Sequence, residues 1–209
     1  MEVRNFSDNP YDIQVGSCEL YRLPEYTPAP SDWAAEDAAE AVELGLVDED
    51  IQWWWKDACT REEFCRMVVR GLEAVTGRSG AELAAGQAAE TFSDCDSEAV
   101  AVASALGIVN GVGHGQFAPE RFLTRQQAAT MLARAAAYLG YEPNGEPAAF
   151  ADADTFADWA TESIAAVSAL RCGAEEVPLM QGKTGGVFDP NGYYTVEQAA
   201  VTVLRMVQF

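Results

Sequence analysis

Three segments of the chain share one pattern of apolar positions behind a threonine. The segments start at Thr60, Thr124 and Thr195, and the residues four and eight positions after each threonine are apolar. Residues at that spacing lie on one face of a helix. A Glu or Gln follows each threonine by three residues, which is the sequence signature of a capping box. The pattern predicts three helices that begin at these threonines and bury one stripe each.

A second kind of helix precedes each of these three. Apolar spacing predicts helices over 32–44, about 97–106 and 158–172, each followed by a glycine, the residue that most readily adopts the left-handed conformation past a helix end. Two of the connecting loops match, because a Phe-x-Pro sequence places Phe117 and Phe188 seven residues before the next threonine. The helix–loop–helix unit recurs at spacings of 64 and 71 residues, which predicts repeats that share one core.

We therefore expect an all-α fold with short loops and little or no sheet. Three helix–loop–helix repeats, over 31–78, 89–141 and 148–209, should form a pseudo-threefold arrangement around a central three-helix bundle. The central helices should bury Val68, Leu132 and Val203. Residues 1–30 contain four prolines and short β-like pieces, and we expect them to be an N-terminal extension, either a linker from an upstream region or a strap across the first repeat.

Charge and composition narrow the function classes. Lys and Arg number 13 against 33 Asp and Glu, for a formal net charge of −20, and such a surface repels nucleic acid and anionic lipid. No apolar run is long enough for membrane insertion. A single histidine, His114, and five cysteines without a CxxC pair argue against a zinc site and against a disulfide scaffold. We interpret the cysteines as small apolar fillers and expect no metal, no cofactor and no catalytic residues.

Several motifs recur in a fixed order along the chain. Phe-x-Asp stands at 92–94 and 150–152, Trp-Ala opens helices at 33–34 and 159–160, and Thr-Arg precedes the helices that follow Thr60 and Thr124. Together with the segment 107–111 and the Phe-x-Pro loops, this order resembles the S-layer homology repeats of bacterial surface proteins. The resemblance covers 31–209 and is clearest in the second repeat.

The resemblance implies a non-catalytic, extracellular module of the bacterial cell surface or cell wall. In that family a monomer folds as an intramolecular pseudo-trimer, and grooves between its repeats bind a secondary cell-wall polysaccharide, often pyruvylated, without a covalent bond. The arginine after the capping threonine is a typical ligand contact, which transfers to Arg61 and Arg125. The third repeat has Val196 there, so we expect at most two competent grooves.

The candidate ligand-binding residues have structural alternatives. Each arginine could instead pair with an aspartate of a neighbouring repeat, the tryptophans at helix starts could be core residues, and the aspartates could be helix caps. Three adjacent tryptophans at 53–55 cannot all be buried, so at least one should be exposed. The full candidate set is Arg61, Arg125, Asp32, Trp33, Asp94, Asp152, Trp159, Trp55 and Gly111.

Two other functions stay open. A structural or protein-interaction module would keep the three-repeat core and have degenerate grooves. A glycosidase would need two carboxylates that face one cleft, and no motif in the sequence indicates such a pair. The chain begins without a secretory signal, which is consistent with an intracellular protein or with a piece excised from a longer precursor. The resemblance to surface proteins favours the second.

Overall fold

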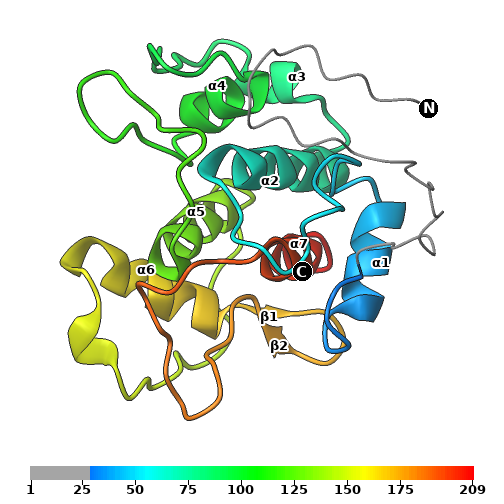
Figure 1. Cartoon of the computed structure of the whole chain (residues 1–209), viewed down its shortest axis with the longest axis vertical. Helices are drawn as coiled ribbons and strands as arrows, with labels where there is room; N and C mark the ends of the chain where they lie inside the picture. The colour runs from blue at the N-terminus through cyan, green and yellow to red at the C-terminus, as the bar shows by residue number, and fades with distance from the viewer. Residues whose placement is uncertain (1–28) are drawn as a thin grey trace, which may run out of the picture.

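The computed structural model describes residues 29–209, and this part of the chain is mostly helical (Figure 1). Residues 1–28, which hold nearly all of the predicted N-terminal extension, lie outside the described part. The elements are α1 (Ala35–Glu43), α2 (Arg61–Thr76), α3 (Gly80–Ala84), α4 (Glu98–Ala105), α5 (Arg125–Tyr138), the 3-10 helix η1 (Ala153–Thr155), α6 (Asp158–Ala169), β1 (Arg171–Cys172), β2 (Val177–Pro178) and α7 (Val196–Val207).

The helices α2, α5 and α7 begin directly after the three predicted threonines. The hydroxyl of Thr60 accepts a hydrogen bond from the Glu63 amide at 3.2 Å, and the Glu63 carboxylate accepts from the Thr60 amide at 2.7 Å. Thr195 makes the same reciprocal pair with Gln198. Thr124 and Gln127 have the same capping-box arrangement, but only one of its two hydrogen bonds forms. The Thr124 amide donates to the Gln127 side chain at 3.1 Å, while the buried Thr124 hydroxyl has no hydrogen-bond partner among the described residues. The predicted helix starts are confirmed, and the caps differ in strength.

This difference yields a stability prediction. Thr60→Ala should lower the free energy of unfolding by about 1 kcal/mol, because the substitution removes a cap bond. Thr124→Ala should cost clearly less, since its hydroxyl makes no such bond. Midpoints of urea denaturation for the two variants measure both values. Equal losses would contradict the difference between the caps.

The three capped helices lie at the centre and are in mutual contact, with α1, α4 and α6 outside them (Figure 1). Val68, Leu132 and Val203 are fully buried, as predicted. The approach of α2 to α7 is close at Gly71, where a Cβ atom would lie 2.8 Å from the Met206 methyl. That close approach explains a glycine in the middle of a helix, where it otherwise costs stability.

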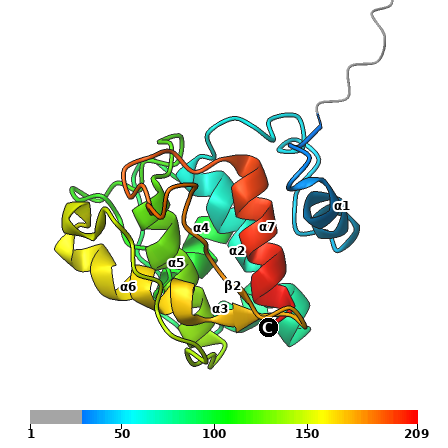
Figure 2. The ribbon, with the colours of Figure 1, turned by 90° about the horizontal axis from the view of Figure 1, so that it is seen from below.

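Each outer helix packs mainly on the capped helix of another repeat. That is the preceding repeat for α4 and α6, and the third repeat for α1. Helix α4 of the second repeat packs on α2, α6 of the third repeat packs on α5, and α1 of the first repeat packs on α7. Figure 2 shows α1 and α6 on opposite sides of the molecule, with α7 beside α1. The repeats are therefore interlocked, because none of them buries its two helices mainly against each other.

A closed ring of backbone hydrogen bonds joins the residues that precede the capping threonines. The amide of Cys59 donates to the Tyr194 carbonyl at 2.8 Å, that of Tyr194 to Leu123 at 2.9 Å, and that of Leu123 to Cys59 at 2.9 Å. The first amides of the capped helices, which have no partner within their own helix, continue this pattern. Those of α2 donate to carbonyls of the second repeat, those of α5 to the third, and those of α7 to the first. The chain thus closes on itself.

Some predicted details are corrected. Helix α6 ends at Ala169, where a helix to Cys172 was expected, because Arg171–Cys172 pairs as a strand with Val177–Pro178. The short helix α3 was not expected. Of the described cysteines, Cys59, Cys65 and Cys172 are buried, Cys95 is partly exposed, and none is in a disulfide, which agrees with their interpretation as fillers. None of the helices between residues 29 and 209 has the length and apolar character needed to cross a membrane.

Candidate ligand-binding grooves

Arg61 and Arg125 are buried and extend into the following repeat. Arg61 is 6% exposed, and its guanidinium donates from Nε to the Phe117 carbonyl at 3.0 Å and from Nη2 to the Asn110 carbonyl at 3.1 Å. It lies over the Phe117 ring, 4.5 Å from the centroid. Burial lowers its pKa, yet an arginine remains charged at neutral pH. The alternative partner, an aspartate of a neighbouring repeat, is not what Arg61 contacts, because its hydrogen bonds go to backbone carbonyls.

Arg125 repeats this arrangement one repeat later. It is 3% exposed, and its Nε donates to the Phe188 carbonyl at 2.7 Å and its Nη2 to the Gln181 carbonyl at 2.8 Å. The guanidinium lies 4.9 Å from the centroid of the Phe188 ring. In the third repeat the equivalent residue, Val196, is buried and has no side-chain donor. Two of the three repeats are therefore joined to the next one by a guanidinium.

The aspartates of the two Phe-x-Asp motifs hold the Phe-x-Pro loops. Asp94 accepts hydrogen bonds from the amides of Phe117 and Ala118 at 2.8 and 2.9 Å. These bonds lower the pKa of Asp94, and the bond from the Phe117 amide has the larger effect. A depressed carboxyl pKa contributes stability that is complete above the ordinary aspartate pKa and is lost as the pH falls through the folded value. The motif residue Phe92 packs on Phe117 at a centroid distance of 5.3 Å.

Asp152 does the same in the third repeat. It accepts from the amides of Phe188 and Asp189, both at 2.8 Å. Desolvation raises its pKa, but the two hydrogen bonds outweigh it and the net shift is downward. Phe150 packs on Phe188 at 5.2 Å. The side chains of both aspartates are thus occupied by backbone amides of the loops, and neither makes a side-chain cap bond, although Asp152 precedes η1.

Groove A is a cavity of about 600 Å³ built from all three repeats. Trp33 comes from the first repeat, Arg125 from the second and Arg205 from the third. Trp33 is 56% exposed, so it is a groove residue and not the core residue that was the alternative. The remaining lining residues are Met180, Gln181, Gly182, Lys183, Thr184, Tyr194, Glu197, Gln198, Val201 and Thr202.

Groove B is a smaller cavity of about 290 Å³. Like groove A, it has one tryptophan and two arginines from three different repeats, but each residue comes from the repeat that precedes, in cyclic order, the one that supplies its counterpart in groove A. Arg61 comes from the first repeat, Arg134 from the second and Trp159 from the third. Trp159 is also 56% exposed. Arg134 and the matching Arg205 of groove A stand ten residues after their capping threonines, and each makes one hydrogen bond to a carbonyl at 3.3 Å.

Glycine is required in the wall of both grooves. A Cβ atom on Gly111 would lie 2.7 Å from the Gln116 carbonyl oxygen and 2.8 Å from the Phe92 ring. A Cβ atom on Gly182 would meet the corresponding atoms of Phe150 and Val187 at 2.7 and 2.9 Å. The predicted site residue Gly111 therefore has a steric role, which is to let the loop pass close to the phenylalanine.

The third cavity, about 350 Å³, lies against α2, α3 and α4 and differs in charge. Arg66 and Arg70 line it together with the four carboxylates of Asp48, Glu62, Glu73 and Glu98. Groove B by contrast is lined by two arginines and no carboxylate. The third cavity includes neither Val196 nor any tryptophan.

The other candidate residues lie outside these cavities. Asp32 is exposed beside Trp33. Trp55 is 6% exposed, and its carbonyl accepts from the Glu197 amide at 2.8 Å. Its neighbours Trp53 and Trp54 are exposed, which agrees with the expectation that the three tryptophans cannot all be buried.

Two positioning residues were missed from the sequence. The Glu197 carboxylate accepts from the Ser31 amide at 2.7 Å and from the Ser31 hydroxyl at 3.1 Å. The Gln126 side chain accepts from the Ala157 amide at 3.2 Å. Glu197 and Gln126 each stand two residues after a capping threonine. Each accepts from the backbone amide that lies two residues before a tryptophan of groove A or B. The shared offset was visible in the sequence, but the partner was not.

These features define a mostly helical module of interlocked repeats with grooves that combine cations and indoles. Residues 93–129 match the family model of the S-layer homology domain. The chain therefore carries an S-layer homology domain, a cell-wall anchoring module of surface proteins. The match lies in the second repeat, where the sequence motifs were clearest.

Comparison with curated proteins gives relatives of the same kind. An endoglucanase from Bacillus sp. (strain KSM-635) is 31% identical over 156 residues, which are 72% of this chain and 15% of the enzyme. A cell surface protein from Thermoanaerobacter kivui is 36% identical over 61% of this chain and 17% of its own length. A surface-layer 125 kDa protein from Lysinibacillus sphaericus is 34% identical over 53% of this chain and 9% of its own length.

The chain thus spans less than a fifth of the length of these relatives. The same holds for an amylopullulanase from Thermoanaerobacterium thermosulfurigenes, which is 33% identical over 48% of this chain and 6% of its own length. What the chain shares with these two enzymes is their S-layer homology region, an anchoring and not a catalytic part. The expected place at the bacterial cell surface agrees with the two relatives named as surface proteins.

Proposed function

We propose that the chain anchors a surface protein non-covalently by binding an anionic cell-wall polysaccharide in grooves A and B. The observation that carries this proposal is that both grooves place two arginines and one exposed tryptophan, from three different repeats, around one cavity. Guanidinium groups bind carboxylates with charge-assisted hydrogen bonds. An exposed indole offers a flat apolar face to a sugar ring.

Local charge supports an anionic ligand. A chain with a formal net charge of −20 repels anions over most of its surface. Three cationic residues and one carboxylate line groove A, and groove B has two arginines and no carboxylate. An anionic polymer would therefore be attracted to these grooves. A carboxylate-bearing sugar, such as a pyruvylated one, fits this chemistry.

The pseudo-threefold arrangement is part of the proposal. The closed ring of hydrogen bonds and the offset packing of outer helices on inner ones support it. Such an arrangement makes three groove positions. At the third, Val196 stands where the other two have Arg61 or Arg125, and the third cavity has no tryptophan. We therefore propose two competent grooves and a monomeric protein in which the three repeats take the place of subunits.

The tryptophans provide the cleanest test because both are exposed. Trp33→Ala and Trp159→Ala should each weaken binding to purified cell-wall sacculi by about tenfold at the affected groove, as is typical when a binding-site aromatic is truncated. Thermal unfolding should change little. Trp54→Ala is the matched control, since Trp54 is 57% exposed and lines none of the three cavities.

Sacculi stripped of their polymer should not retain the parent protein. If both tryptophan variants bind like the parent, grooves A and B are not the binding sites. The chain would then be a structural or protein-interaction module with degenerate grooves. One observation favours that second function: Arg61 and Arg125 are already hydrogen-bonded to backbone carbonyls, which accounts for them without a ligand.

A further inference from the structure

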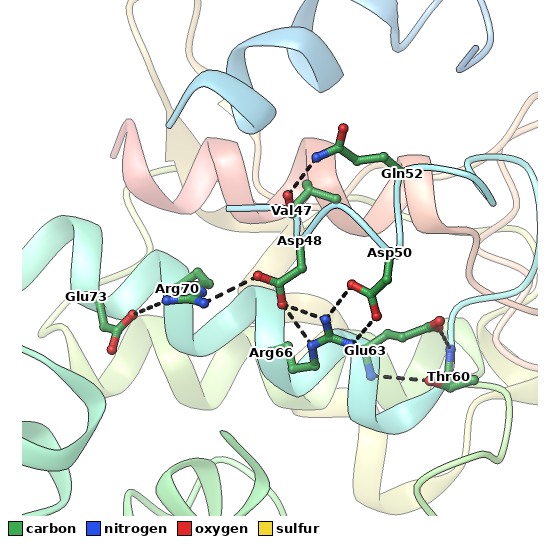
Figure 3. Close-up of polar contacts among 9 residues, drawn as sticks. All are labelled: Val47, Asp48, Asp50, Gln52, Thr60, Glu63, Arg66, Arg70 and Glu73. Atoms are coloured by element: carbon green, nitrogen blue, oxygen red, sulfur yellow. Dashed lines mark hydrogen bonds and ion pairs between the residues drawn. The ribbon is translucent and has the colours of Figure 1, made fainter. Parts of the chain in front are cut away.

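An ionic network that grooves A and B lack lies at the third cavity (Figure 3). Asp48, Arg66, Arg70 and Glu73 line the cavity, and Asp50 pairs with Arg66 from outside its lining. Arg66 donates from Nη1 and Nη2 to the two carboxylate oxygens of Asp50 at 3.0 and 2.6 Å. Its Nε donates to Asp48 at 2.8 Å. Arg70 donates to the other oxygen of Asp48 at 3.3 Å and pairs with Glu73 at 3.5 Å. Every nitrogen of the Arg66 guanidinium therefore has a carboxylate partner.

The positions in the repeat show what this network replaces. Arg70 stands ten residues after its capping threonine, as Arg134 and Arg205 do in the other two grooves. Asp48 follows Gly45 by three residues, as Asn110 follows Gly107, and Asn110 supplies a wall of groove B. The first repeat thus puts a carboxylate where the second has a neutral side chain.

The contact between Arg66 and Asp50 has the geometry that a bound carboxylate would adopt. Two parallel N–H···O bonds between a guanidinium and a carboxylate form the bidentate pair typical of anion recognition. Hydrogen bonding to Arg66 also lowers the pKa of Asp50, which keeps this carboxylate charged. Asp48 and Asp50 lie on one short loop after α1, so the chain itself tethers both carboxylates near the arginines.

We propose that the third cavity is an anion-binding site held closed by Asp48 and Asp50, which take the place of a carboxylate ligand. A tethered group competes at an effective concentration on the order of millimolar, so an anion present at micromolar concentration cannot displace it. The analogy with grooves A and B rests on the proposed function, but the anion-binding capacity of Arg66 does not. The class of ligand is a carboxylate, such as a sugar acid.

The test uses glucuronate as the probe and the full chain. The side-chain Nε–H signal of Arg66, assigned by its absence in Arg66→Ala, is followed by nuclear magnetic resonance during titration. In the parent it should respond only at glucuronate concentrations above the effective concentration of the tethered carboxylates. In the double variant Asp48→Asn, Asp50→Asn the half-maximal concentration should fall at least about tenfold below that of the parent, because the tethered competitors are gone.

Glu73→Gln is the matched control. It removes one negative charge from the same network, leaves the two carboxylates on Arg66 in place, and should behave like the parent. A response at equal concentration in parent and double variant, or in neither, would overturn the inference. If the double variant does not fold, Asp50→Asn alone removes the bidentate carboxylate and leaves Asp48 on Nη2 and Nε of Arg66. It should still lower the half-maximal concentration below that of the parent, and an unchanged value would overturn the inference equally.

The result also separates this inference from the proposed function. A responding Arg66 in the double variant, together with a parent that fails to bind sacculi, would reject the polysaccharide grooves and leave the closed anion site standing. If the parent binds sacculi but the Arg66 signal of the double variant does not respond to glucuronate, the polysaccharide grooves stand and the closed anion site is rejected.

Discussion

Replacing Arg125 by alanine is expected to lower the free energy of unfolding by about 3 kcal/mol, because hydrogen bonds from a charged donor contribute about 1.5 to 3 kcal/mol each and the buried carbonyls lose their partner. The guanidinium is 3% exposed and donates to two carbonyls of the third repeat while it lies over the Phe188 ring. Guanidinium chloride denaturation followed by circular dichroism measures the change.

Lysine should not rescue this position. Its ammonium is a compact charge that cannot reproduce the planar fork which joins two separate carbonyls. Arg134→Ala is the matched control, because Arg134 is only partly buried and makes one hydrogen bond at 3.3 Å, and it should cost less than about 1 kcal/mol. If Arg125→Ala is as mild as Arg134→Ala, the inter-repeat contact is not what stabilises the fold.

The same variant tests the ligand role of Arg125. If the Arg125 side chain also contacts the ligand in groove A, Arg125→Ala should weaken binding to sacculi more than Trp33→Ala does. Arg61→Ala repeats the experiment one repeat earlier, with similar bonds at 3.0 and 3.1 Å. A loss of binding in both arginine variants without loss of stability would assign them to the ligand and not to the fold.

A chain cut to residues 29–147 is expected to lose cooperative folding altogether, while the full chain unfolds in one transition. Removal of the third repeat takes α7 from both α1 and α2. It also opens the ring of hydrogen bonds at Tyr194 and leaves the buried Phe64 without its T-shaped partner at 5.8 Å. A repeat that cannot bury its apolar face on a neighbour has no independent core.

Differential scanning calorimetry of the two chains measures this effect. The control is the separate 148–209 fragment, which should restore a cooperative transition when it is mixed with 29–147, since the missing contacts are non-covalent. A cooperative transition in 29–147 alone would show that the first two repeats fold without closure of the ring.

The sequence determined the local features of the fold. A capping threonine, the Glu or Gln three residues later and the apolar stripe all act within one or two turns of a helix, so the starts of α2, α5 and α7 and the burial of Val68, Leu132 and Val203 could be predicted. The glycines after α1 and α4 were readable for the same reason, since both have positive φ angles. The motif order also indicated the family.

Only the tertiary structure decided which groups meet across repeats. The outer helices pack on the preceding repeat and the first amides of α2 donate to the following one, because unpaired amides at a helix start can donate to any carbonyl that the packed chain brings to them. No local pattern names that carbonyl. For the same reason the sequence could offer Arg61 and Arg125 as ligand contacts but could not show that their guanidinium groups are buried against Phe117 and Phe188, because these contacts form only when one repeat packs against the next.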